Sequence, residues 1–248
     1  MTGYELINLI APELVLVVGA MVVLLVGLGR ASRARFLSGW VSLGAIGVAL
    51  FAAWNMESPA GEAVLGLRVT DLTWYVRVAG LGVGAAVLLV HWHLPRPAER
   101  GDLFAMILFS LAGVLATGLA DDLIVLFLAL ELVSVPTYVL VSIGRGDVRA
   151  QEAGVKYFVL GAFASAVLLY GIAMVYGGTG STNLVDISAF LPGTVLAEAG
   201  LVLAGLALLL VGFGFKVAAV PFHAWTPDVY QGAPSPTVVW MASGVKVA

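Results

Sequence analysis

Three ionisable side chains, Glu131, Lys216 and Lys246, stand inside long apolar stretches of this sequence. Burial disfavours a charged lysine and a nearby carboxylate favours it, so a lysine and a glutamate whose separation varies can take up and release a proton. These residue types therefore suit a proton relay in which movement of Glu131 towards or away from Lys216 switches the proton. The structural alternative is that the charges form fixed ion pairs that only hold helices together.

Glu131 is expected at mid-membrane depth. It lies nine residues after Asp122, about 14 Å along a helix, in an apolar run that must cross about 30 Å of hydrocarbon. An ionisable group at that depth costs at least about 2.5 kcal/mol, so it should face a bundle interior, a partner or a water path. Ser134 and Pro136 follow it closely. Because Pro136 cannot donate to the carbonyl of Leu132, that carbonyl is free for water or a polar side chain near the carboxylate.

Lys216 precedes a segment in which a helix should break, Pro221-Phe222-His223-Ala224-Trp225-Thr226-Pro227-Asp228. Pro221 cannot donate to the carbonyl of Val217. Broken helices at membrane depth line cavities or are buried in protein, and transporters use them to bind ions. Lys216 is therefore expected at the edge of a polar break, with a lysine that extends to the membrane interface as the structural alternative.

Two further residues belong to the same region. Lys246 lies ten residues after Pro236, about 15 Å into the next helix, too deep to reach the interface. His223, in the break, titrates near neutrality and is interpreted either as an additional relay residue or as an interfacial hydrogen-bonding residue.

Composition limits what this chain can do by itself. Hydrophobic residues make up 61% of the 248 positions and charged residues 11%, against about 25% charged in a soluble domain. Cysteine is absent and histidine occurs three times, which excludes disulfides, iron–sulfur clusters and thiolate metal sites within this chain. The sequence predicts no metal ion and no cofactor here, and any redox group must lie elsewhere.

Apolar runs recur along almost the whole chain, which predicts an all-α membrane protein, a polytopic bundle of about eight transmembrane helices. The runs predict helices near residues 12–29, 36–55, 72–94, 103–120, 122–143, 154–177 and 196–220, with an eighth that begins near Pro236. The eighth is still apolar at Ala248, so we expect the polypeptide to continue within that helix.

The basic residues predict the orientation of the bundle. Cytoplasmic loops collect lysine and arginine, and alternate loops of this chain differ strongly in both. One set of loops holds eight basic residues, whereas the other holds Arg68, with Arg77 just inside a helix. The eight are Arg30, Arg33, Arg35, Arg96, Arg100, Arg145, Arg149 and Lys156. This distribution predicts an N-terminus on the outer side of the membrane.

Three segments carry a resemblance to a known family. They are Gln151-Glu152-Ala153-Gly154-Val155-Lys156-Tyr157-Phe158 continued to Ala166, Leu130-Glu131-Leu132 with Pro136 and Tyr138, and Phe215-Lys216 with Pro221 to Tyr230 and Gly232 to Thr237. In these segments the chain resembles the N subunit of bacterial NADH-quinone oxidoreductase, respiratory complex I. The resemblance extends over essentially the whole chain.

The resemblance implies an antiporter-like fold with a discontinuous helix seven. It implies three N-terminal helices in residues 1–102 and a first antiporter-like repeat, helices four to eight, in residues 103–248. Glu131 would be the helix-five glutamate, Lys216 the broken-helix lysine and Lys246 the helix-eight lysine that passes protons towards the second half-channel. The three would act as modulator, switched carrier and onward relay, in that order. The second repeat and its lysine are missing from this chain, so the resemblance gives only an input half-channel.

The same resemblance implies a proton-translocating, non-redox subunit of an NADH-quinone oxidoreductase. FMN, iron–sulfur clusters, NADH and quinone would belong to partner subunits. The partners would be other antiporter-like and small membrane-arm subunits and the lipid bilayer, without nucleic acid. The location would be the bacterial inner membrane, with a periplasmic N-terminus.

Two other functions fit the same residues. One is a subunit of a multisubunit cation/proton antiporter or of a membrane-bound hydrogenase, against which the segment from Gln151 to Ala166 argues. The other is a non-pumping membrane scaffold, in which the buried charges are structural pairs.

Overall fold

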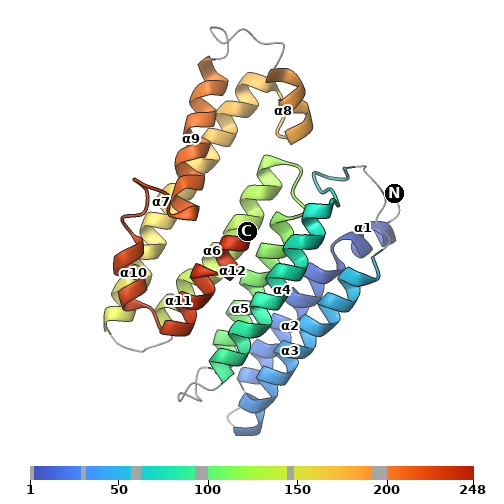
Figure 1. Cartoon of the computed structure of the whole chain (residues 1–248), viewed down its shortest axis with the longest axis vertical. Coiled ribbons are helices and arrows are strands. Elements are labelled where there is room, and N and C mark those ends of the chain that lie inside the picture. The colour runs from blue at the N-terminus through green and yellow to red at the C-terminus, as the bar shows by residue number, and fades with distance from the viewer. Residues whose placement is uncertain (1–2, 29–31, 57–62, 93–99, 144–147, 192–199) are drawn as a thin grey trace.

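The computed structural model describes residues 3–28, 32–56, 63–92, 100–143, 148–191 and 200–248. The first part of the chain forms a bundle of long helices that run side by side (Figure 1). Its helices are α1 (Gly3–Leu9), α2 (Ala11–Gly27), α3 (Ser32–Trp54), α4 (Asp71–Trp92) and α5 (Arg100–Thr117). α5 packs against α2, α3 and α4, and the leucine-rich face of α5 is the centre of this core.

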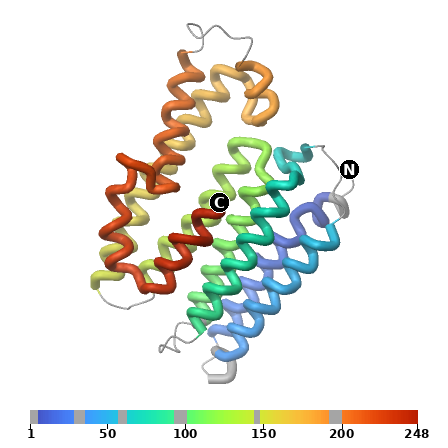
Figure 2. Tube along the Cα trace, viewed as in Figure 1, coloured from blue at the N-terminus to red at the C-terminus, as the bar shows by residue number. Residues whose placement is uncertain are grey.

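The second part of the chain begins with α6 (Leu123–Ile143), which packs against α5 on one side and α7 (Val148–Thr179) on the other. α7 pairs with α9 (Gly200–Val217), and these two helices extend beyond the first bundle, as the tube in Figure 2 shows. The shorter helices are α8 (Leu184–Phe190), α10 (Thr226–Gly232), α11 (Ser235–Ala242) and α12 (Gly244–Val247). α11 and α12 return across α4, α5 and α6.

The predicted all-α membrane fold is confirmed. Each of the seven long apolar runs forms one helix, α2 to α7 and α9. Five of these helices are long and apolar enough to cross a membrane, and α2 and α5 are shorter apolar helices. Within the described residues there is no strand, and pairing is limited to isolated bridges such as Asp122 with Asn183. The chain is a multi-pass membrane protein.

Several element boundaries differ from the predicted ones. α1, α8 and α10 were not predicted, because each has only 7 residues and none forms a long apolar run. α7 begins at Val148 instead of residue 154, since its first turns are polar and are supported by the Glu152–Lys156 ion pair one turn apart. The predicted eighth helix is interrupted at Ser243, which divides it into α11 and α12.

The division at residue 102 stays a prediction. α5, the first helix of the predicted repeat, packs against the three helices before it as well as against α6. The predicted orientation also stays a prediction. Of the basic residues on which it rests, Arg30, Arg96 and Arg145 and the side chains of Arg33, Arg35 and Arg100 lie outside the described residues.

Glycines set the distance between α7 and α9, the two helices that carry part of the site described below. Gly171 and Gly205 face each other at the crossing, where a Cβ on Gly205 would lie 2.8 Å from the backbone nitrogen of Val175 and 2.9 Å from the carbonyl of Gly171. Small residues at such positions let helix backbones approach closely in membranes. This close approach holds Lys216 on α9 near the buried face of α7.

Candidate functional site

Lys216 and Glu131 form an ion pair inside the bundle. The Nζ of Lys216, at the end of α9, donates to Oε1 of Glu131 on α6 over 2.9 Å and to Oγ of Ser134 over 2.8 Å. The side chain of Lys216 is 14% exposed and that of Glu131 is 24% exposed, so most of the surface of the pair is covered by protein. Ser134 donates its own hydrogen to the carbonyl of Leu130 over 2.7 Å, which leaves its oxygen to accept from Lys216.

The helix that carries Lys216 ends immediately after it. The backbone nitrogen of Ala219 donates to the carbonyl of Gly214 over 2.8 Å, and that of Ala218 donates to the carbonyl of Phe215 over 3.0 Å. This pattern, with a positive φ of 57° at Ala218, is a Schellman motif in which alanine takes the position usually held by glycine. The predicted break is therefore confirmed, and α9 ends at Val217, four residues before Pro221.

Lys246 lies against this helix end. Its Nζ donates to the backbone carbonyl of Lys216 over 3.0 Å. The last carbonyls of a helix lack partners within the helix, and a cation near them interacts favourably with the helix dipole. The break thus exposes the acceptor that binds Lys246, and the structure brings Glu131, Lys216 and Lys246 together, which the sequence alone did not establish.

Ser165 on α7 completes the polar cluster and was not predicted. Its hydroxyl donates to Oε1 of Glu131 over 2.5 Å, the same oxygen that Lys216 contacts. Ser165 is buried, on a face of α7 with Gly161, Ala164 and Leu168. The sequence offered one signal for it: Ser165 is a polar residue on a helix face of small residues, and such faces allow close helix packing.

A cavity of about 150 Å³ lies beside Lys216, between the broken helix and α6. Its polar lining comes from Ser134, Tyr138, Tyr157, Lys216 and Lys246. A buried water needs roughly 10 to 15 Å³ of such space and two or more polar partners, so this cavity can hold several waters. The two lysines therefore share one chamber that is large enough for a hydrogen-bonded water chain.

Aromatic side chains close the cavity at the break. Trp225 stacks on Tyr157 with ring centroids 4.7 Å apart and on Phe215 with centroids 5.3 Å apart. Its Nε1 donates to the carbonyl of Phe215 over 3.3 Å. These contacts fix the chain after the break against α7 and so keep Lys216 in place.

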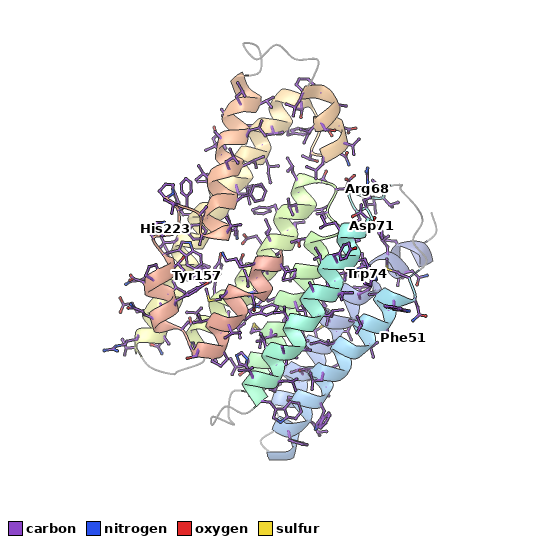
Figure 3. The ribbon with its side chains drawn as sticks, viewed as in Figure 1. Phe51, Arg68, Asp71, Trp74, Tyr157 and His223 are labelled. Atoms are coloured by element: carbon purple, nitrogen blue, oxygen red, sulfur yellow. The ribbon has the colours of Figure 1, made fainter. Side chains whose placement is uncertain are left out.

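His223 and Lys156 lie outside this cluster. His223 is exposed in the loop between α9 and α10 and does not line the cavity, and Figure 3 places it on the side of the molecule far from Arg68 and Asp71. Its relay role stays a prediction. Lys156 is exposed and forms ion pairs with Glu152 over 2.8 Å and Asp228 over 3.1 Å, at a polar hollow beside α10.

A second buried ion pair contains Arg77, which the sequence placed just inside a helix and counted with the cations of the outer side. Arg77 is 2% exposed, and its guanidinium binds Glu13 on α2 through Nε to Oε1 and Nη2 to Oε2, each over 2.9 Å. Arg77 does lie inside a helix, α4, but its burial and its partner were not predicted. Glu13 is 64 positions away from Arg77 in the sequence, so residue spacing along one helix does not reveal this pairing.

Among the described residues, no group of three histidine, cysteine or acidic side chains could hold a metal ion.

Fold and site together define a polytopic helical membrane protein in which a broken helix holds a lysine–glutamate pair within the bundle. The family described as NADH:quinone oxidoreductase/Mrp antiporter, TM, matches residues 120–248, the part that contains this pair. The chain belongs to this family. NADH-quinone oxidoreductase subunit N of Myxococcus xanthus is 43% identical over 244 residues, which are 96% of this chain and 47% of that protein. The chain therefore spans about half the length of the curated relatives it matches.

Solved structures agree with this assignment. A chain of respiratory complex I from Thermus thermophilus with bound aureothin superposes with a TM-score of 0.77 at 31% identity, over 95% of this chain and 51% of that chain. A chain of the Mrp complex from Dietzia has a TM-score of 0.78 at 23% identity, over 96% of this chain and 27% of that chain, which shows the shared fold. The antiporter-like fold predicted from the sequence is confirmed.

Proposed function

We propose that this chain is the proton-relaying half of an antiporter-like membrane subunit of an NADH-quinone oxidoreductase. The observation that carries the proposal is the position of Lys216. Its ammonium contacts Glu131 and Ser134, and its own carbonyl, freed by the helix break, binds Lys246. The names of the relatives, NADH-quinone oxidoreductase subunit N, support the assignment to this enzyme.

The relay would use changes in the separation of Glu131 and Lys216. While the two side chains are in contact, each stabilises the charged form of the other. When they separate, the desolvated ammonium of Lys216 loses that support and releases a proton to water in the adjacent cavity. The proton then reaches Lys246, which lines the same cavity. Reprotonation of Lys216 and return of Glu131 restore the pair.

This role assigns the redox chemistry to other polypeptides. NADH, FMN, iron–sulfur clusters and quinone would bind to partner subunits, consistent with the absence of cysteine from this sequence. The partners would be other antiporter-like and small membrane-arm subunits. The chain would lie in the bacterial inner membrane with its N-terminus on the periplasmic side, and it would take part in the enzyme as a non-redox translocating subunit.

The experiment compares Lys216→Met, Lys216→Arg and Glu131→Gln in the whole complex reconstituted into vesicles. Protons moved per NADH oxidised are measured with a pH-sensitive dye, and assembly is measured by copurification of the flavin and iron–sulfur subunits. Arginine keeps the positive charge but does not titrate at accessible pH. A relay therefore predicts that Lys216→Arg lowers the proton yield as Lys216→Met does, although the complex assembles.

The alternatives predict other outcomes. If the pair is only structural, Lys216→Arg should keep normal pumping because it preserves the ion pair. Normal proton yield in assembled Lys216→Arg and Glu131→Gln complexes would reject the relay. Purification without flavin or iron–sulfur subunits, with cation-driven proton exchange in vesicles, would instead identify an antiporter.

A further inference from the structure

We propose that Ser165 is a positioning residue that holds Glu131 in its ionised form, so that its hydroxyl sets the pH range over which the Glu131–Lys216 pair keeps its charges. The inference rests on the proposed function and deepens it. It assigns a role to a buried hydroxyl on α7, a helix that supplies neither member of the ion pair.

The acceptor of this hydrogen bond separates Ser165 from the other buried helical hydroxyls described here, whose acceptors are backbone carbonyls, as when Ser110 on α5 donates to the carbonyl of Val133 on α6. Buried serine and threonine hydroxyls in a helix commonly donate to the carbonyl four residues earlier. Ser42, Ser134 and Thr137 do so, each over 2.7 Å. Ser165 instead donates across the helix interface to the Glu131 carboxylate over 2.5 Å. Its hydroxyl is therefore aimed at the charged group of the site.

Ser165 and Lys216 meet at one oxygen of Glu131, Oε1, over 2.5 Å and 2.9 Å. The two donors come from different helices, α7 and α9. When Lys216 moves away, Ser165 is the donor that remains on that oxygen. It therefore keeps the carboxylate oriented and ionised during the separated state, so that the proton released by Lys216 goes to the cavity and not back to Glu131.

The other titratable groups around Glu131 do not replace this donor. Lys216 on α9 and Lys246 on α12 line the cavity beside the pair, together with Tyr138 on α6 and Tyr157 on α7. Both tyrosines lie close enough to interact with the charge of Glu131. Within the described residues, the side chains that donate to its carboxylate are Ser165 and Lys216, and neither tyrosine does so.

Glycine positions allow the arrangement. One turn before Ser165, the absence of a side chain at Gly161 leaves room for the hydroxyl of Tyr138. The Gly171–Gly205 crossing keeps α7 and α9 close, so that Ser165 and Lys216 reach the same carboxylate. The placement of Ser165 thus follows from the packing of three helices.

The test uses Ser165→Ala, Ser165→Thr and Ser165→Cys in the intact complex, with Ser42→Ala as the matched control. Ser42 is also buried, but its hydroxyl donates within its own helix, to the carbonyl of Ser38. Proton yield is measured from acid to alkaline pH, and infrared difference spectra measure the C=O band of protonated Glu131, identified by its loss in Glu131→Gln.

Removal of a donor destabilises the carboxylate, so Glu131 should take up a proton at a higher pH. For Ser165→Ala we expect the acid limb of the proton-yield profile and the infrared titration both to shift upward by about one pH unit. Ser165→Thr, which keeps the hydroxyl, should restore the profile, and Ser42→Ala should not change it. Cysteine, a weak donor of similar size, should give an intermediate shift, and it provides the test if Ser165→Ala fails to assemble.

An unshifted infrared titration in Ser165→Ala or Ser165→Cys would overturn the inference, even where Glu131→Gln and Lys216→Arg abolish pumping. If Glu131→Gln and Lys216→Arg pump normally, the proposed function fails. The infrared readout separates the two results because it does not depend on pumping.

Discussion

The guanidinium of Arg77 binds both carboxylate oxygens of Glu13, in a two-point contact that joins α4 to α2. The same guanidinium donates to the carbonyl of Leu9 over 2.8 Å, next to the end of α1. Planar, bidentate contacts of this kind are the strong form of the arginine–carboxylate interaction. The pair joins two N-terminal helices and shares no residue with the Lys216 cluster, so we expect it to hold these helices together.

Loss of one partner of this pair should strongly destabilise the protein. For Arg77→Met or Glu13→Gln we expect about 3 to 5 kcal/mol of destabilisation, because an unpaired charge or donor stays buried. The effect is measured by heating the purified complex and recording the temperature at which this subunit unfolds and is lost from the complex. Arg68→Met is the control, since the Arg68–Asp121 pair is 30% exposed on its arginine side and should cost at most about 1 kcal/mol. Equal effects of the two arginine changes would contradict the prediction.

The hydrogen bond between Trp240 on α11 and Ser110 on α5 should contribute to stability. Its Nε1 donates to Oγ of Ser110 over 3.0 Å, and Ser110 donates to the carbonyl of Val133 on α6 over 3.0 Å. We expect Trp240→Phe to cost about 1 to 3 kcal/mol through lost volume and the lost bond. A double-mutant cycle with Ser110→Ala should give a coupling energy of about 0.5 to 1.5 kcal/mol. Strict additivity would show that the bond contributes nothing.

The α7–α9 crossing should not tolerate a methyl group. A Cβ at Gly205 meets backbone atoms of α7 within 3.0 Å, so Gly205→Ala must separate the helices. We expect at least about 1 to 3 kcal/mol of destabilisation and a lower proton yield, because Lys216 moves away from Glu131. Gly82→Ala is the control, as its Cβ meets nothing within 4 Å and alanine favours helix. Wild-type stability and proton yield in both variants would contradict the close approach of α7 and α9 at Gly205.

Ala218 offers a stabilising change at the helix break. Its φ of 57° lies in the left-handed region, which is unfavourable for alanine and readily adopted by glycine. We therefore expect Ala218→Gly to raise stability by about 0.5 to 1 kcal/mol, measured as a higher unfolding temperature. Ala219→Gly, at the next residue, should give no such gain, and a loss of stability in Ala218→Gly would argue against the Schellman motif.

His223 should be dispensable for pumping. It is exposed and lies outside the cavity, which favours its interfacial interpretation over the relay one. We expect His223→Ala to keep a proton yield close to that of the wild type, whereas Lys246→Ala should lower it strongly, because Lys246 lines the cavity and binds the end of α9. A comparable loss in both variants would place His223 in the path.

Amino-acid order alone determined the long helices and the break after Lys216. Apolar runs of membrane-spanning length can satisfy their backbone hydrogen bonds in hydrocarbon only as helices, and a proline cannot continue the bonding of the helix before it. An ionisable side chain within such a run is costly, so Glu131 and Lys216 could be identified as candidate functional residues. Short helices such as α8 left no comparable signal, because 7 residues form no long apolar run.

Only the tertiary structure decided which side chains meet. Whether Lys216 contacts Glu131, and whether Ser165 joins them, depends on how three helices are rotated and how closely they cross. The pairing of Arg77 with Glu13 depends in the same way on the packing of α4 against α2. The period of a single helix defines its own faces but not the faces of its neighbours. Local sequence thus determined the long helices, and packing between distant segments determined the partners of each charge.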